Sequence, residues 1–230
     1  MKNHQNELIS KAFDRGNGEY RNLLMKNCEF NNCGISLTAE INQRSTVSNI
    51  EIIDCKALNC AIGPAIITDA HISNLATGDL QILWGTLFNR VKIDGKIGRL
   101  KINTRIHAPD ATETQQKHFD DFRRDFYQNI DWAIDIRDAH PQLLEIKGIP
   151  SEKIIFNPAH CVPLNRSSAK KSILEIAKSS STPKDWSFTI SDFFEDAEAD
   201  ELILIAPTGK SKKAASPYLD VIRLIRDSGL

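Results

Sequence analysis

The 230-residue sequence lacks the features that identify several common protein classes. Its net charge is only −1, from 29 basic and 30 acidic residues, so nothing indicates a general attraction to nucleic acid or to an anionic membrane. No apolar run approaches the length of a membrane span, and the N-terminus has no apolar stretch of the kind that forms a secretory signal. The five cysteines are too few, and odd in number, for a disulfide framework. These absences predict a reduced, cytoplasmic protein that binds neither nucleic acid nor membrane.

Common catalytic signatures are also missing. There is no Gly-x-Ser-x-Gly, no His-Glu-x-x-His and no Cys-x-x-Cys. Thr208-Gly-Lys-Ser211 follows an apolar run and resembles the second half of a phosphate-binding Walker A loop. That loop needs a glycine at position 204, where the sequence has Leu204. We therefore interpret residues 208–211 as a solvated loop and predict no cofactor.

What the sequence does contain is a repeated block in its first half. Four similar blocks begin at Asn27, Asn49, Asp69 and Asn89, so each follows the one before at a nearly constant step of about 20 residues. Within each block apolar and polar residues alternate, which is the period of a half-buried strand. Two further sets keep the same step: Cys60, Leu80 and Leu100, and Ile62, Ile82 and Ile102.

Short strands that repeat at a fixed step are typical of coils stacked on one another. We predict an N-terminal parallel β-solenoid of about four coils of about 20 residues, over residues 21–108. The pieces Cys28-Glu-Phe-Asn-Asn-Cys33 and Ile50-Glu-Ile-Ile-Asp-Cys55 resemble the pattern of the pentapeptide-repeat proteins, and the resemblance spans about residues 22–103. A short, three-sided parallel β-helix of the kind found in bacterial proteins is the alternative interpretation.

The two ends of the chain show other patterns. Apolar residues of segment 5–14 follow helical spacing, which predicts a cap helix within residues 1–20. Thr112 and Gln115 have the spacing of a capping box at the start of an amphipathic helix. Mixed helix and strand patterns follow, including an alternating segment 186–190 that predicts a strand. We therefore expect a small α+β domain over residues 109–230, packed on the open end of the solenoid.

Four groups of residues are candidates for chemistry. Cys28, Cys33, Cys55 and Cys60 could form a four-cysteine zinc site, but cysteine is also a common buried residue, and we predict no metal site. His107, His118 and Asp135 lie near the predicted junction and are the candidates for catalysis. Asp138 and His140 join Asp135 in a polar cluster that suits either a metal or a hydrogen-bonded strand end. His160 and Cys161 are adjacent, so in a strand they point to opposite faces.

Two hypotheses of function follow. We favour a non-enzymatic protein-interaction module, acting as a scaffold, immunity or regulatory component that uses a rigid solenoid face. Its partner is then another protein or a second copy in a homo-oligomer. The alternative is a small hydrolase with its site at the junction of the two halves. The binding module is favoured because half of the chain is repeat and no catalytic motif is complete, and whether the protein is an enzyme stays open.

Overall fold

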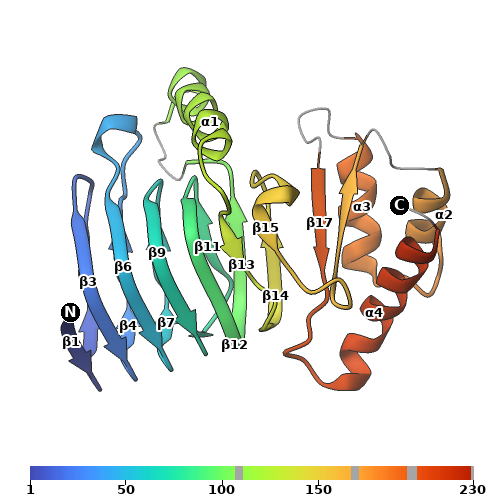
Figure 1. Cartoon of the computed structure of the whole chain (residues 1–230), viewed down its shortest axis with the longest axis horizontal. Helices are drawn as coiled ribbons and strands as arrows, with labels where there is room; N and C mark the ends of the chain where they lie inside the picture. The colour runs from blue at the N-terminus through green and yellow to red at the C-terminus, as the bar shows by residue number, and fades with distance from the viewer. Residues whose placement is uncertain (107–110, 167–170, 196–200, 229–230) are drawn as a thin grey trace.

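The structure is a computed structural model that describes residues 1–106, 111–166, 171–195 and 201–228. Parallel strands lie side by side along most of the molecule, and the helices gather mainly at the C-terminal end (Figure 1). None of the helices in these ranges is both long and apolar enough to cross a membrane.

The largest sheet holds 11 strands and curls into a half-barrel. Its path runs β1-β3-β6-β9-β12-β11-β8-β5, and β13, β14 and β15 join it through β12. The bounds are β1 Lys2–Gln5, β3 Glu19–Lys26, β5 Gly34–Ile35, β6 Thr46–Ile53, β8 Ala61–Ile62, β9 Ile66–Ser73, β11 Gln81–Trp84, β12 Leu87–Asn103, β13 Ile134–Asp135, β14 Ala139–Ile146 and β15 Ile154–Ile155.

Two smaller sheets and the helices complete the described chain. A four-stranded parallel sheet is formed by β2 (Leu8–Ser10), β4 (Glu29–Asn31), β7 (Lys56–Leu58) and β10 (Ala76–Thr77). An antiparallel pair is formed by β16 (Cys161–Asn165) and β17 (Glu201–Ile205). The helices are α1 (Glu113–Gln128), α2 (Lys171–Lys178), α3 (Lys184–Glu195), α4 (Lys212–Asp227) and the short 3-10 turns η1 (Ile41–Gln43) and η2 (Ser151–Lys153).

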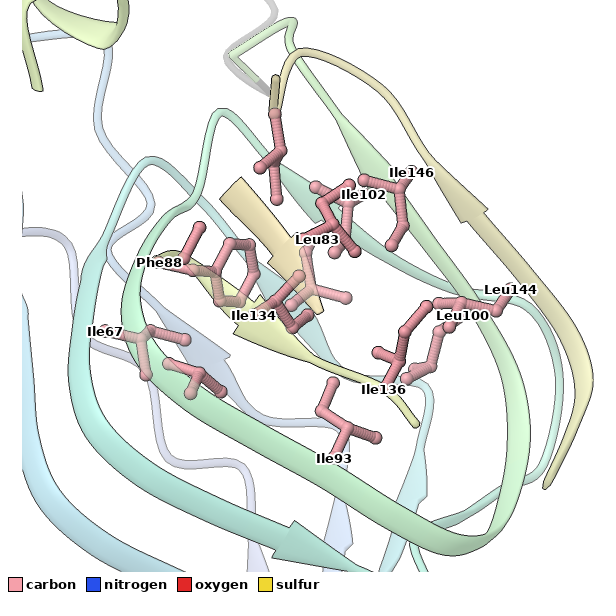
Figure 2. Packing of buried hydrophobic residues seen from close by; sticks show 14 of the residues in the cluster. Ile67, Leu83, Phe88, Ile93, Leu100, Ile102, Ile134, Ile136, Leu144 and Ile146 are labelled. Atoms are coloured by element: carbon pink, nitrogen blue, oxygen red, sulfur yellow. The ribbon is translucent and has the colours of Figure 1, made fainter. Parts of the chain in front are cut away.

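Inward side chains of the large sheet form one continuous core. Ile50, Ala70, Val91 and Ile134 are register partners on four neighbouring strands, and each is buried. Figure 2 shows aliphatic and aromatic side chains from facing strands meeting inside the curl. Burial of one such large side chain stabilises the fold by about 1.5–3 kcal/mol, so this core keeps the strands in register.

The antiparallel pair lies between two cores. Ile203 and Ile205 of β17 pack into the core of the large sheet, whereas Leu204 belongs to a second core with Val162 and the helices α2, α3 and α4. This division follows from the alternation of side chains along a strand. The C-terminal helices are therefore joined to the curled sheet through one two-stranded layer.

The predicted solenoid of equal coils followed by a small α+β domain is wrong. Leu23 of β3 pairs with Ile50 of β6, and Ile50 pairs in turn with Ala70 of β9, so the first step along the chain is longer than the second. No constant step exists, because the segment around η1 adds residues between one pair of strands and not the next. The observed architecture is a curled, mostly parallel sheet, neither a solenoid nor a β-helix.

The predicted columns are also wrong, because the strands pair in another register. Leu100 pairs with Gln81 instead of Leu80, and Leu83 pairs with Ile62 where Ile82 was expected. The large sheet also takes in β13, β14 and β15 from beyond residue 108. How the chain divides into domains stays a prediction.

Two local predictions are also wrong, and one is confirmed. Segment 5–14 contains the last residue of β1 and the whole of β2 instead of a cap helix, because the edges of β3 and β4 are available for pairing. Segment 186–190 lies in α3, where Trp186 and Ile190 bury one face. The capping box of Thr112 and Gln115 is present at the start of α1.

Candidate functional site: a polar groove beside the 206–211 loop

A groove of about 580 Å³ opens where the four-stranded sheet ends at β10. It is bordered by β10, by the bent part of β12, by the start of β14 and by the loop between β17 and α4, which lies next to the large sheet (Figure 1). Its polar side chains are those of Asp54, Asn74, Thr77, Lys96, His140 and Gln142. A concave surface with a few convergent polar groups is the default candidate for a binding site.

Asn74 organises one wall of the groove. Asp54 and Asn74 follow β6 and β9, and both have left-handed backbones, with φ of 55° and 52°. Short Asx side chains tolerate this conformation at sharp bends. The Asn74 amide nitrogen donates to the Asp54 carboxylate at 3.0 Å, and its oxygen accepts the backbone N–H of Lys96 at 2.9 Å. Asn74 therefore links the bends that follow β6 and β9 to the strand β12.

Two glycines allow the close approaches that shape the groove. A Cβ on Gly98 would lie 2.3 Å from the hydroxyl oxygen of Thr77, and a Cβ on Gly209 would lie 2.4 Å from the carbonyl oxygen of His140. Because both distances are shorter than real Cβ contacts, only glycine lets β12 pass β10 and the loop reach β14 at these positions. The Gly209 N–H also donates to the Pro141 carbonyl at 2.8 Å.

The loop that resembles part of a Walker A motif thus docks on β14. Leu204, where that motif needs glycine, is buried in the second core. The side chain of Ser211 accepts from the Ala214 N–H and caps α4. Thr208 lies against His140, with 3.3 Å between the hydroxyl oxygen and Nδ1.

His140 also lies beside His160, with 6.4 Å between the ring centroids. Burial, followed by the positive charge of His140, lowers the pKa of His160. Cys161, the next residue, is buried in the core of the large sheet, and burial raises its pKa to about 12. Cys161 is therefore a thiol at neutral pH and does not act as a nucleophile there.

Two donors of the groove, on Lys96 and Gln142, have no partner within the described ranges. Lys96 and His140 are register partners on β12 and β14, and both side chains are exposed. Gln142 follows two residues after His140, so its side chain is on the same face of the strand. No ion pair is formed by the Lys96 ammonium and no hydrogen bond by the Gln142 amide in this part of the chain, whereas Lys101, further along β12, pairs with Glu145 at 2.7 Å.

The predicted catalytic residues are not brought together in the described structure. His118 is exposed on α1, and His107 lies outside the described residues. Asp135 is buried on β13 and accepts hydrogen bonds from the Arg137 guanidinium at 2.7 and 3.1 Å. Burial opposes ionisation of Asp135, but the bonds from Arg137 outweigh it and lower its pKa.

The residues of the predicted polar cluster are not brought together either. Asp138 lies 3.8 Å from the Lys92 ammonium, and His140 contacts Thr208. Asp135, Asp138 and His140 thus have three different partners, as the interpretation of a hydrogen-bonded strand end requires. No group of three or more His, Cys, Asp or Glu in the described ranges is placed to hold a metal ion.

The cysteines form two stacked pairs that flank β4 and β7. The Cys28 N–H donates to the Cys55 sulfur at 3.4 Å, and both side chains are buried. The Cys33 and Cys60 thiols donate to backbone carbonyl groups at 3.3 and 3.4 Å. Burial raises the pKa of Cys55 and of Cys60. The spacing of these cysteines therefore reflects contacts between neighbouring strands.

A polar pair on the outer face of the large sheet was not predicted from the sequence. His71 Nε2 lies 2.8 Å from the Asp94 carboxylate, which also pairs with the Lys92 ammonium at 3.2 Å. His71 and Asp94 are 23 residues apart, and they meet only because β9 and β12 are neighbours. The alternation within each strand was the one available signal, and it does not identify partners on another strand.

No family model matches this chain, and no curated protein is significantly similar to it. The resemblance to pentapeptide-repeat proteins stays a prediction.

Proposed function

We propose that this protein is a non-enzymatic interaction module, a scaffold, immunity or regulatory component, and that it binds another protein in the polar groove. The observation that supports this function is the set of exposed donors on β12 and β14 that lack a partner within the described residues, Lys96 and Gln142 in particular. Donors of this kind gain hydrogen bonds when a partner covers them.

The backbone beneath the groove is held in place by the rest of the fold, which favours tight binding of a partner. Parallel strands, the buried aliphatic core and the Asn74 hydrogen bonds fix the backbone on which these side chains stand. A preformed surface loses little conformational entropy on binding, so more of the contact energy contributes to affinity. All five cysteines are free, which supports the reduced, cytoplasmic location that forms part of this proposal.

Site-specific cross-linking tests the proposal. A photo-reactive benzoylphenylalanine is placed at Gln142 in the full chain, and the protein is illuminated in its own cells. We expect a discrete cross-linked protein adduct, because position 142 borders the groove and is exposed. The matched control carries the same group at Lys178, which is exposed at the end of α2.

The outcomes separate clearly. An adduct from position 142 and none from position 178 supports the proposal, and mass spectrometry then tells a foreign protein from a second copy of this chain. The absence of an adduct at position 142, or equal adducts at both positions, contradicts it.

The alternative is a small hydrolase, and one contact favours it. The Thr208 hydroxyl and the His140 imidazole are 3.3 Å apart, within the looser reach of a nucleophile and its base in an unliganded enzyme. However, the N–H groups of Gly209 and Lys210 already donate to the carbonyl groups of Pro141 and Pro207. They are therefore not available to stabilise an oxyanion, which such a reaction needs.

Thr208→Val tests the hydrolase. The substitution removes the hydroxyl and keeps the shape of the side chain. Hydrolysis of nitrophenyl esters or phosphates that is present in the native protein and lost in this variant, at unchanged thermal stability, would establish the alternative. Absence of hydrolysis in both proteins removes its basis.

A further inference from the structure

We infer that the partner presents an acidic segment, whose carboxylate binds between Lys96, His140 and Gln142. This inference rests on the proposed function and names the chemistry that the groove recognises. The three side chains come from the paired strands β12 and β14 and stand on one outward face. Together they offer an ammonium, an imidazole and an amide N–H group, all of which can donate to a carboxylate.

Neighbouring carboxylates in the described chain are already engaged, which leaves the positive charge of Lys96 uncompensated. Asp94 is shared by His71 and Lys92, and Asp138 also lies near Lys92. Asp79, on the turn after β10, lies 3.6 Å from the Arg99 guanidinium. Each of these acids is therefore paired with a cation other than Lys96.

Among the described residues that line the groove, Asp54 is the acidic one. Asn74 lies between Asp54 and Lys96. Its amide nitrogen donates to the Asp54 carboxylate, and its oxygen accepts the Lys96 N–H. The Asp54 carboxylate therefore accepts from the Asn74 amide, and it forms no ion pair with Lys96 in the described part of the chain.

The loop after β17 carries a second lysine next to a residue that lines the groove. Gly209 borders the groove, and the next residue, Lys210, is exposed. The Lys210 ammonium lies 5.5 Å from the centre of the Tyr218 ring and forms no ion pair within the described ranges. Charge complementarity therefore favours an extended segment of the partner. Its acidic side chain lies next to Lys96 and β14, and its backbone N–H groups face Asp54.

The test uses fluorescein-labelled octaglutamate as the probe and octaglutamine with the same label as its neutral counterpart. Anisotropy titrations with the full chain are run at about 0.01 M and about 1 M salt. We expect binding of octaglutamate at low salt, little binding of octaglutamine, and loss of binding at high salt, since the attraction is electrostatic.

Three variants locate the site. Lys96→Glu is expected to weaken octaglutamate binding about tenfold, and Lys96→Gln by a smaller factor, because it removes the charge without reversing it. Lys117→Glu is the matched control, since Lys117 is exposed on α1 and outside the groove, and we expect it to change binding less than about twofold. Circular dichroism of each variant establishes that the fold is kept.

Failure of this inference is distinguishable from failure of the proposed function. No binding of octaglutamate, or equal weakening by Lys96→Glu and Lys117→Glu, overturns the acidic segment. Cross-linking at position 142 that persists in the Lys96→Glu variant would overturn it as well, while leaving the interaction module intact. Loss of that cross-link in Lys96→Glu, together with the tenfold effect on the probe, supports both.

Discussion

The side-chain oxygen of Asn74 accepts the backbone N–H of Lys96 at 2.9 Å, and this bond joins the bend after β9 to the bend of β12. Asn74 also holds a left-handed backbone, with φ of 52°. Asn74 therefore accepts a hydrogen bond from β12 and also forms the bend after β9. It lines the groove.

Substitution of Asn74 tests this double role. Asn74→Ala is expected to lower the free energy of unfolding by about 1–3 kcal/mol, because it leaves the Lys96 N–H without its acceptor and strains the left-handed bend. Asn74→Gly loses the acceptor but tolerates the positive φ, so its loss in urea denaturation should be smaller. Equal losses for the two variants would show that the backbone conformation contributes nothing.

Asp135 and Arg137 form an ion pair whose effect depends on pH. The folded-state pKa of Asp135 is lowered, so the pair stabilises the fold above the ordinary pKa of an aspartate, near 4, and this contribution is lost as the pH falls below it. Arg137→Leu should therefore reduce the urea midpoint at pH 7. The difference from the native protein should narrow toward pH 3, and a constant difference would contradict the pairing.

His160 is expected to link stability to pH in the neutral range. Its pKa is lowered by burial and by His140, so the folded state favours the neutral ring. Stability is full above the usual histidine pKa, near 6.5, and decreases as the pH falls toward the lowered value. His160→Gln should flatten the fall in urea midpoint between pH 7.5 and pH 5, and an unchanged slope would exclude this role.

Gly209 fixes the loop on β14. Gly209→Ala would place a methyl group 2.4 Å from the His140 carbonyl oxygen, and this backbone atom cannot move aside easily. We expect a loss of about 1–3 kcal/mol in the free energy of unfolding, as for other overpacked positions. Lys210→Ala is the exposed neighbour and should change stability by less than about 0.5 kcal/mol. Faster hydrogen exchange at the Gly209 amide than in the native protein would locate the disturbance.

The groove was beyond the reach of the sequence analysis. Its polar residues run from Asp54 to Gln142 along the sequence, and they meet because the bends after β6 and β9 lie beside β10, β12 and β14. Nothing in the sequence identifies which bends share a wall of the groove. His140 was grouped with Asp135 by proximity in sequence, whereas the structure places it against Thr208, 68 residues later.

The sequence by itself determined several local conformations. Alternating apolar residues produced strands around Ile50 and Ile72, Thr112 and Gln115 produced a capped helix, and Asn49 occupies a left-handed bend. These features depend on a residue and its near neighbours along the chain, so their causes can be read there.

Only the tertiary structure decided which strands pair and in what register. The segment around η1 lengthens the step from Leu23 to Ile50 beyond that from Ile50 to Ala70, so a regular repeat in the sequence does not become a column in space. Leu8 and Phe13 have helical spacing, yet they remain 66% and 54% exposed in and beside an edge strand. Pairing with an available strand edge and burial against distant residues outweigh local preference, because their free energies are summed over many contacts between distant parts of the chain.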